Sequence, residues 1–273
     1  MTDILIDGNC LFARAWYKVQ AEALPGYSCA VESLGLGIRL VINILNPDVN
    51  KMNLLFHRAL FAWDHKPENS EFAESLGIFK DLCRLLFGGV SVEIPGVEAD
   101  DILATAAFHS KRDCLVMVVS ADKDLMQLIG ENRHYFDLTE KVELNPLRVC
   151  SKFPGLKKPE HIPAYMAVLG HKNKGIPGVA GFGQAHCAEL FKETNADMTL
   201  SEVAQFVLHK IPKEQHKNFL VSLKKATLKK DIPGIPEPTE IKFSEPSVVR
   251  DTGLESLLED YTKAYQRYEI APF

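Results

Sequence analysis

Apolar runs alternate with amphipathic stretches through the first half of the chain. Apolar runs predict strands at residues 4–6, 53–63, 90–94, 114–119 and 134–138, and the strongest is the β-branched run at residues 114–119. Between them, apolar residues at helical spacing predict helices at about residues 11–21, 34–45, 79–86 and 100–108. Strands that alternate with helices predict an α/β fold, with a mostly parallel central sheet flanked by helices.

The second half of the chain has a different pattern. From about residue 159 the strand pattern stops and only helices are predicted. Pro146, Pro154, Gly155 and Pro159 mark a change of composition just before this point. We therefore predict two domains, an α/β domain over residues 1–158 and a helical region over residues 159–273.

Composition and charge narrow the class of protein. The six cysteines are scattered without a CxxC pair, which argues against a zinc site and favours reduced thiols in a cytosolic protein. No apolar run reaches the roughly 18 residues of a membrane span, and the N-terminus lacks the pattern of a signal peptide. The net charge of −5 does not point to nucleic acid, yet acids in one region offset by basic residues elsewhere would give the same total.

Acidic residues follow predicted strands or begin predicted helices. Because ligands bind at the carboxyl ends of parallel strands, Asp7, Asp64 and Asp122 are expected at one edge of the sheet. The full set is Asp7, Asp64, Glu98, Asp100, Asp101, Asp122 and Asp124. So many carboxylates in one cleft need cations, and Mg²⁺ or Mn²⁺ would serve phosphoryl chemistry there. Each acid alone is more simply explained as a helix cap, and Asp100 or Asp101 is a candidate cap.

A glycine-rich segment precedes a predicted helix at residues 184–191. Its glycines allow tight turns, and the helix N-terminus presents N–H groups that suit a phosphate. An ordinary turn between helices is the other interpretation, and nearby lysine runs are equally expected on a solvated helix face. The candidate DNA-binding residues are Lys172, Lys174, Gly178, Val179, Gly181, Gly183, Gln184, Lys224 and Lys225.

Several motifs occur in the order of one known family. The stretches that carry the resemblance are residues 4–9 (ILIDGN), 61–67 (FAWDHKP), 95–101 (PGVEADD), 119–125 (VSADKDL), 176–190 and 228–233. Together they resemble the 5′-nuclease or flap endonuclease family, in its prokaryotic or phage 5′-3′ exonuclease form, since no clamp-binding tail is visible. The resemblance implies a PIN-like nuclease fold, followed by a helical DNA-binding subdomain with a helix–hairpin–helix, also called a helix–three-turn–helix.

The resemblance also implies a mechanism and partners. The protein would hydrolyse DNA phosphodiester bonds with Mg²⁺ or Mn²⁺ at branched, flap, nicked or gapped duplexes, or at RNA/DNA hybrids. It would act as a monomer in the cytoplasm of a prokaryote or phage-infected host, and K⁺ at the hairpin is compatible with the family. Around the first metal the resemblance places Asp7, Asp64, Glu98, Asp100 and Asp122, with Lys66 near the scissile phosphate. It places Asp101 and Asp124 toward a second metal.

The chain departs from the family pattern in two places. Where the family has two aspartates before the hairpin, this sequence has His171 and Lys174. His171 could ligate Mn²⁺ but is a poor Mg²⁺ ligand. The Lys174 ammonium either partly replaces the second metal near Asp124 or meets a DNA phosphate. The second metal site is therefore expected to be reduced.

The second departure is the arch that helps thread a 5′ flap in the family. Asp64 and Glu98 are only 34 positions apart, which leaves too few residues for a long arch. Threading, and the preference for free 5′ ends, should then relax. Two alternatives remain open: a catalytically weak or inactive branched-DNA-binding protein on the same fold, and an RNA-directed nuclease, which the hairpin disfavours.

Overall fold

The computed structural model describes residues 1–23, 29–48, 50, 52, 54–65, 70–111 and 113–270. Its strands are β1 (Thr2–Asp7), β2 (Arg58–Trp63), β3 (Val90–Glu93), β4 (Leu115–Ser120), β5 (Arg133–Asp137), β6 (Val142–Leu144) and β7 (Thr239–Glu240). Its α-helices are α1 (Gly8–Glu22), α2 (Ala30–Leu45), α3 (Glu71–Phe87), α4 (Ala99–His109), α5 (Pro146–Lys152), α6 (Ile162–Leu169), α7 (Gln184–Lys192), α8 (Leu200–Lys210), α9 (His216–Ala226), α10 (Pro246–Asp251) and α11 (Leu258–Ile270).

The chain forms two compact units. Unit 1 contains residues 1–121, 136–143 and 230–273, and unit 2 contains residues 122–135 and 144–229. The C-terminal residues therefore belong to the same unit as the first strands, because their apolar side chains are buried in its core. A compact unit is not by itself an independently folding domain, so the predicted boundary between residues 158 and 159 stays a prediction.

The sheet has the order β3-β2-β1-β4-β5-β6, with β7 beside β2. Strand β1 is central and parallel to both neighbours: Ile4 pairs with Ala59 of β2 and with Met117 of β4. Since β2 is also parallel to β3, the carboxyl ends of β1 to β4 lie at one edge of the sheet. The prediction of a mostly parallel central sheet is confirmed.

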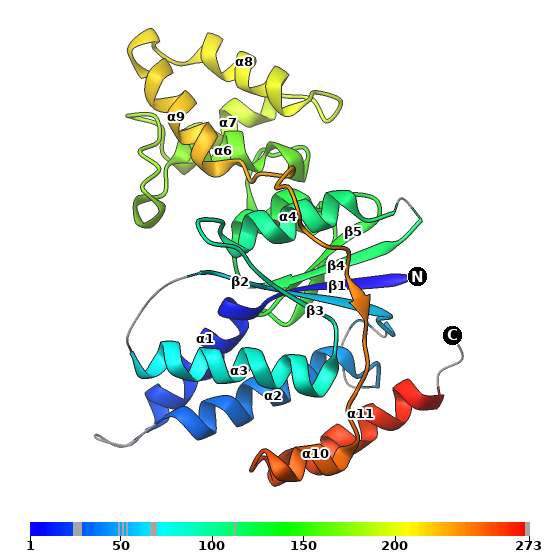
Figure 1. Cartoon of the computed structure of the whole chain (residues 1–273). Coiled ribbons are helices and arrows are strands. Elements are labelled where there is room, and N and C mark those ends of the chain that lie inside the picture. The colour runs from blue at the N-terminus through cyan, green and yellow to red at the C-terminus, as the bar shows by residue number, and fades with distance from the viewer. Residues whose placement is uncertain are drawn as a thin grey trace. The chain divides into compact units, whose positions relative to one another are not determined.

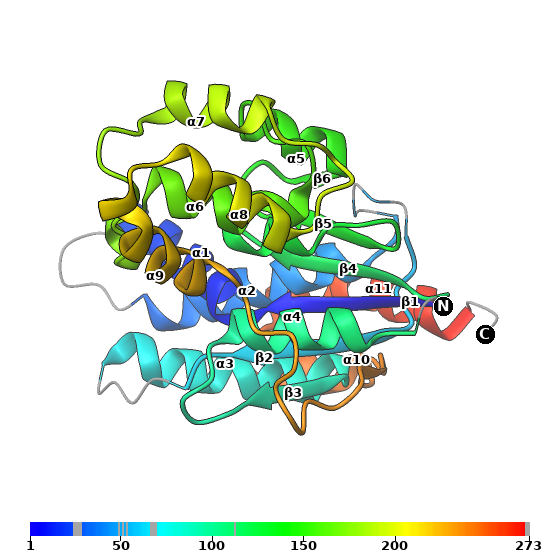
Figure 2. The same ribbon diagram turned by 90° about the horizontal axis from the view of Figure 1, so that it is seen from above.

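Helices cover both faces of the sheet in unit 1. Figure 1 shows α1, α2 and α3 on one face and α4 on the other, and Figure 2 shows the same arrangement from above. Helix α11 packs against α2, where Leu257 and Tyr261 are buried. The Tyr261 hydroxyl donates to the Leu86 carbonyl at 2.7 Å, which ties the C-terminal segment to the end of α3.

Two sequence expectations are corrected here. Strand β7 lies beyond residue 159, where only helices were predicted; its two residues pair antiparallel with β2, and so short a strand carries no alternation to detect. Helix α3 begins at Glu71, eight residues before the predicted start, because the Ser70 hydroxyl accepts a hydrogen bond from the Ala73 N–H and caps it.

Unit 2 is mainly helical. Helix α6 packs against α7, α8 and α9, and its residues from Ile162 to Val168 are buried. The 3₁₀ helices η1 (Lys123–Leu128) and η3 (Lys172–Lys174) lie in the same unit. Among the described helices of the whole chain, none is long and apolar enough to cross a bilayer. None of the six cysteines, all of which the structure describes, forms a disulfide bond.

Candidate metal and nucleic-acid sites

Asp7 ends β1 and caps α1. Its Oδ1 accepts a hydrogen bond from the Cys10 N–H at 2.9 Å, and its Oδ2 accepts from the Ser120 hydroxyl at 2.7 Å. The carboxylate is 5% exposed, so these donors replace much of its hydration. A Cβ at Gly8 would lie 2.3 Å from the Trp63 ring, which explains why glycine follows Asp7 at this strand end.

Asp64 joins three elements of unit 1. It directly follows β2, whose Ala62 pairs with Asp7, so the two aspartates lie at the same edge of the sheet. The Asp64 N–H donates to Asn9 Oδ1 at 2.9 Å, and Asp64 Oδ1 accepts from the Ala99 N–H at 2.8 Å. Asp64 is thereby connected to the start of α1 through its backbone and to the start of α4 through its side chain.

The remaining acids of unit 1 lie at the start of α4. Glu98 is the N-cap residue by backbone conformation, but its side chain makes no capping hydrogen bond and is exposed. Asp100 and Asp101 lie in the first turn, where a negative charge favours the helix dipole. Neither is the cap, so the capping interpretation offered for these two residues is wrong.

The donor chemistry of these acids suits a hard divalent cation, because carboxylate oxygens are the ligands that Mg²⁺ and Mn²⁺ prefer. The arrangement of these side chains, however, is not that of a complete metal site. In the part of the chain that the structure describes, no group of three or more His, Cys, Asp or Glu side chains is gathered closely enough to hold a metal ion. The metal ligand set therefore stays a prediction, and Lys66 lies outside the described residues.

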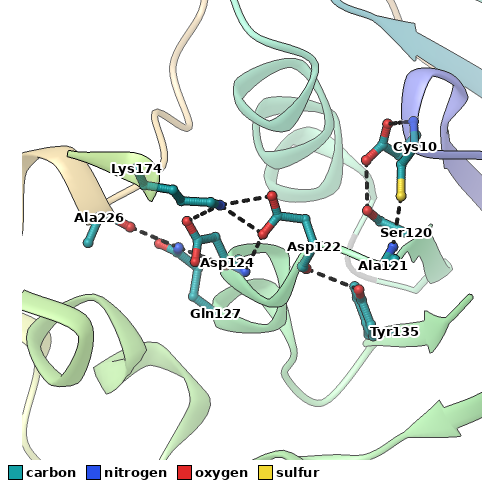
Figure 3. Close-up of polar contacts among 10 residues, drawn as sticks. Cys10, Ser120, Ala121, Asp122, Asp124, Gln127, Tyr135, Lys174 and Ala226 are labelled. Atoms are coloured by element: carbon teal, nitrogen blue, oxygen red, sulfur yellow. Dashed lines mark hydrogen bonds and ion pairs between the residues drawn. The ribbon is translucent and has the colours of Figure 1, made fainter. Parts of the chain in front are cut away.

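In unit 2, Asp122 and Asp124 share one lysine (Figure 3). The Lys174 Nζ lies 2.9 and 2.8 Å from the two carboxylate oxygens of Asp122 and 2.5 Å from Oδ2 of Asp124. Burial lowers the pKa of the Lys174 ammonium, but its hydrogen bonds and charge interactions with both aspartates outweigh burial and raise that pKa well above its usual value. Lys174 thus carries a fixed positive charge between the two acids.

Neighbouring side chains hold the backbone of these two acids. The Gln127 amide donates to the Asp124 carbonyl at 2.8 Å and to the Ala226 carbonyl at 3.1 Å, which ties η1 to the end of α9 (Figure 3). The Tyr135 hydroxyl donates to the Asp122 carbonyl at 3.0 Å. Asp122 also caps η1, since its Oδ1 accepts from the Asp124 N–H at 2.9 Å.

His171 precedes Lys174 on the same short segment. Its backbone N–H and carbonyl both pair with Ile176, at 2.8 and 3.1 Å, so the turn between them is closed. The His171 Nδ1 is buried and has no hydrogen-bond partner in the structure. The suggestion that His171 ligates Mn²⁺ stays a prediction.

The glycine hairpin between η3 and α7 is shaped by backbone conformation. Gly178 and Gly181 have φ values of +73° and +83°, which favour glycine. Gly183 is the N-cap residue of α7, which confirms the predicted helix start at Gln184. Val179 is buried and its N–H donates to the Val168 carbonyl at 2.8 Å, so it anchors the hairpin to α6.

The candidate lysines differ in their contacts. Lys172 and Lys224 are exposed. The Lys225 Nζ donates to the Gly175 carbonyl at 2.8 Å, so Lys225 also supports the turn that follows Lys174. These residues are all in unit 2, but none of their contacts tests the predicted binding to DNA.

Charge is divided unevenly between the units. Unit 2 has 15 Lys and Arg residues against 9 Asp and Glu residues, a net charge of +6. Unit 1 has 16 against 27, a net charge of −11, and the two values give the total of −5. A polyanion would therefore be attracted to unit 2, and cations to unit 1.

Comparison with known proteins points to one family. Residues 61–154 match the model described as the 5′-3′ exonuclease, N-terminal resolvase-like domain. The chain is 34% identical over 205 residues to the thermostable DNA polymerase I of Thermus aquaticus, covering 70% of this chain and 24% of that one. It is 26% identical over 197 residues to a 5′-3′ exonuclease of Aquifex aeolicus, covering 70% of this chain and 67% of that one. The chain is therefore similar to proteins of the 5′-nuclease family.

Solved structures support the fold of this chain. The bacteriophage T5 flap endonuclease, in a pseudo-enzyme–product complex with DNA and metal ions, aligns with a TM-score of 0.60 at 15% identity, covering 97% of this chain and 100% of that one. T5 5′-exonuclease with bound zinc aligns with a TM-score of 0.58 at 16% identity, covering 97% and 99%. At this identity the likeness establishes the PIN-like fold alone. The chain spans about a quarter of the polymerase relatives' length.

Four supporting residues were not among the predicted site residues: Asn9, Ser120, Gln127 and Tyr135. Asn9 and Ser120 had a detectable signal, because each is a polar residue within three positions of an acid at a predicted strand end. Gln127 and Tyr135 had none, since their partners are main-chain carbonyls that no side-chain pattern reveals.

Proposed function

We propose that this chain is a metal-dependent, structure-selective 5′-nuclease that hydrolyses DNA phosphodiester bonds. The observation that carries the proposal is the carboxyl edge of the unit 1 sheet. There Asp7 ends β1, and Asp64 directly follows the adjacent parallel strand β2. Asp64 also accepts a hydrogen bond from the first residue of α4, the helix that Glu98 precedes and that contains Asp100. The match of residues 61–154 to the 5′-3′ exonuclease domain model and the similarity to a 5′-3′ exonuclease support it.

In this proposal the unit 1 acids hold a divalent cation. A bound Mg²⁺ or Mn²⁺ would supply an activated water and neutralise charge on the phosphate. Cys10 N–H and the Ser120 hydroxyl orient the Asp7 carboxylate, and the Ala99 N–H orients that of Asp64. Lys66 is proposed to lie near the scissile phosphate. The structural relative with bound divalent zinc ions supports a divalent metal, and another relative holds DNA together with metal ions.

The substrate we propose is duplex DNA with a flap, branch, nick or gap. The net charge of +6 on unit 2 would attract the phosphate backbone, and the α7 N-terminus at Gly183 and Gln184 suits a phosphate contact that carries no sequence information. K⁺ at the hairpin and activity on RNA/DNA hybrids belong to the same proposal. We expect a monomer in the bacterial cytoplasm, since the relatives are bacterial.

Two features would distinguish this enzyme within its family. The second metal site is proposed to be reduced, because His171 and Lys174 stand where acids are expected. The arch is proposed to be short: α3 begins at Glu71, seven residues after Asp64, and part of that interval lies outside the described residues. A short arch would not enclose a single strand, so cleavage should depend little on a free 5′ end.

A second candidate function is a branched-DNA-binding protein with weak or no catalysis. It is favoured by the ammonium on Asp122 and Asp124 and by the lack of an assembled group of three metal-binding side chains among the described residues. Against it, the chain keeps every acid that the resemblance assigns to the first metal: Asp7, Asp64, Glu98, Asp100 and Asp122.

Cleavage of a 5′-labelled flap duplex tests the proposal. We expect cleavage product with Mg²⁺ or Mn²⁺ and none with EDTA. The cleavage rate should fall at least about 100-fold in Asp7→Asn. Replacing a residue that supports a metal ligand costs up to about 100-fold in activity, and replacing a ligand itself should cost no less. Asp7→Asn keeps the acceptor for the Cys10 N–H. The control Asp113→Asn changes an exposed acid before β4, at the opposite edge of the sheet, and should cleave normally. Tight, salt-sensitive binding without cleavage in either metal would leave the binding protein as the function.

A further inference from the structure

The segment around Lys174 is built to hold one ammonium group in place. Gly175 has φ +62° and follows Lys174, and the backbone pair between His171 and Ile176 closes the turn. The Lys225 Nζ fixes the Gly175 carbonyl at 2.8 Å. The lysine backbone is therefore restrained on both sides of its side chain.

The acceptor side is restrained as well. The carbonyls of Asp122 and Asp124 are held by Tyr135 and Gln127, and Asp122 Oδ1 also accepts the Asp124 N–H. The Asp124 side chain is 11% exposed, so water reaches little of that carboxylate, while the Lys174 and Asp122 side chains are 33% and 29% exposed. All of these residues belong to unit 2, so the arrangement is internal to one compact part of the chain.

Carboxylate oxygens match the N–H donors of the ammonium in number. A lysine side chain carries three N–H donors, and three carboxylate oxygens lie within 2.5 to 2.9 Å of Nζ. To contact a DNA phosphate, Lys174 would have to give up a carboxylate. A divalent cation faces the same obstacle, because it would have to displace the ammonium from the same oxygens and then remain close to it.

We propose that Lys174 is a built-in cation that occupies the Asp122–Asp124 carboxylate pair and excludes a divalent metal from it. The inference rests on the proposed function for its biological meaning: a nuclease built this way would bind its metal through the unit 1 acids. Asp122 and Asp124 then serve to position Lys174, and the positive charge at this point needs no metal from solution.

Metal counting tests the inference without measuring activity. Mn²⁺ is titrated into the full-length protein, and the number of ions bound per chain is obtained from the electron paramagnetic resonance signal of free Mn²⁺. We expect Lys174→Met to bind one more Mn²⁺ than the wild type, and the variant Lys174→Met/Asp124→Asn to lose that ion again. Lys172→Met, an exposed lysine of the same 3₁₀ helix, should bind as many ions as the wild type.

Two outcomes would overturn the inference. One is a folded Lys174→Met, judged by circular dichroism, that binds no additional Mn²⁺. The other comes from Asp124→Asn alone, which keeps the wild-type lysine and remains informative if Lys174→Met does not fold. If Lys174 excludes the metal, Asp124→Asn leaves the Mn²⁺ count of the wild type unchanged; a loss of one ion would show that a metal binds there already.

Failure of the inference and failure of the proposed function give different results. Cleavage by the wild type together with either overturning count would leave the nuclease and remove the role of Lys174. The expected counts without cleavage in any metal would keep Lys174 as a built-in cation, in a protein that only binds DNA.

Discussion

The Asp7 carboxylate shows how a single residue can serve both the fold and the proposed chemistry. It is nearly buried and accepts hydrogen bonds from the Cys10 N–H and the Ser120 hydroxyl. A buried carboxylate without such donors would be strongly destabilising, so the capping role and the proposed metal-binding role support each other. The bland interpretation of this acid as a helix cap is correct for Asp7, and it does not exclude a ligand.

Ser120→Ala should therefore destabilise the protein by about 1.5–3 kcal/mol, the value of a hydrogen bond to a charged group. The alanine fits the space but leaves Oδ2 of Asp7 without this donor. Urea unfolding at neutral pH measures the change. Ser151→Ala is the control, because the exposed Ser151 hydroxyl bonds only to the Arg148 carbonyl of its own helix, and a change within about 0.5 kcal/mol is expected. Equal losses in the two variants would show that the Ser120–Asp7 hydrogen bond contributes nothing specific.

At the scale of elements, the apolar pattern predicts most of unit 1. Residues 114–119 and 100–108 are recovered almost unchanged as β4 and α4, since their side chains are buried as the pattern requires. Element starts were harder to predict: α1 begins at Gly8, three residues before the predicted start, because Asp7 caps it. The pairing of Lys174 with Asp124 was anticipated only by resemblance, because the 50 residues between them leave no periodic signal.

Two glycines of the hairpin, Gly178 and Gly183, differ in whether the backbone requires glycine. Gly178 has φ +73°, and a Cβ there would lie 2.8 Å from Gly170 backbone atoms. Gly178→Ala should thus cost about 1–3 kcal/mol of unfolding free energy. At Gly183, with φ −85°, a Cβ meets nothing within 4 Å, so Gly183→Ala should change stability by no more than about 1 kcal/mol. Urea unfolding of both variants measures the two changes in stability. Similar stabilities would mean that the hairpin is not held against the end of α6.

At the scale of the whole molecule, unit 1 is formed by segments of the sequence that come before and after most of unit 2. Residues 230–273 come back to add β7, α10 and α11 to unit 1, and Ile241 and Tyr261 join its core. These residues follow α9 closely in the sequence, so the basic end of that helix, in unit 2, comes just before a segment of acidic unit 1. The net charge of −5 conceals this division, and only the structure shows which lysines share a unit.

Salt dependence tests whether the positive charge of unit 2 binds DNA. Each phosphate contact adds about −0.9 to the slope of log affinity against log salt, so Lys224→Ala should reduce the slope by about 0.9 if Lys224 makes one contact. Lys224 is preferred to Lys225, whose ammonium supports the Gly175 carbonyl and would confound stability with binding. Fluorescence anisotropy of a labelled flap duplex in EDTA, over a series of KCl concentrations, gives the slope. The control is Lys263→Ala, an exposed lysine of α11 in acidic unit 1 that pairs with Glu259. If both variants keep the wild-type slope, Lys224 makes no phosphate contact; if Lys263→Ala alone reduces it, the DNA is bound by unit 1 despite its charge.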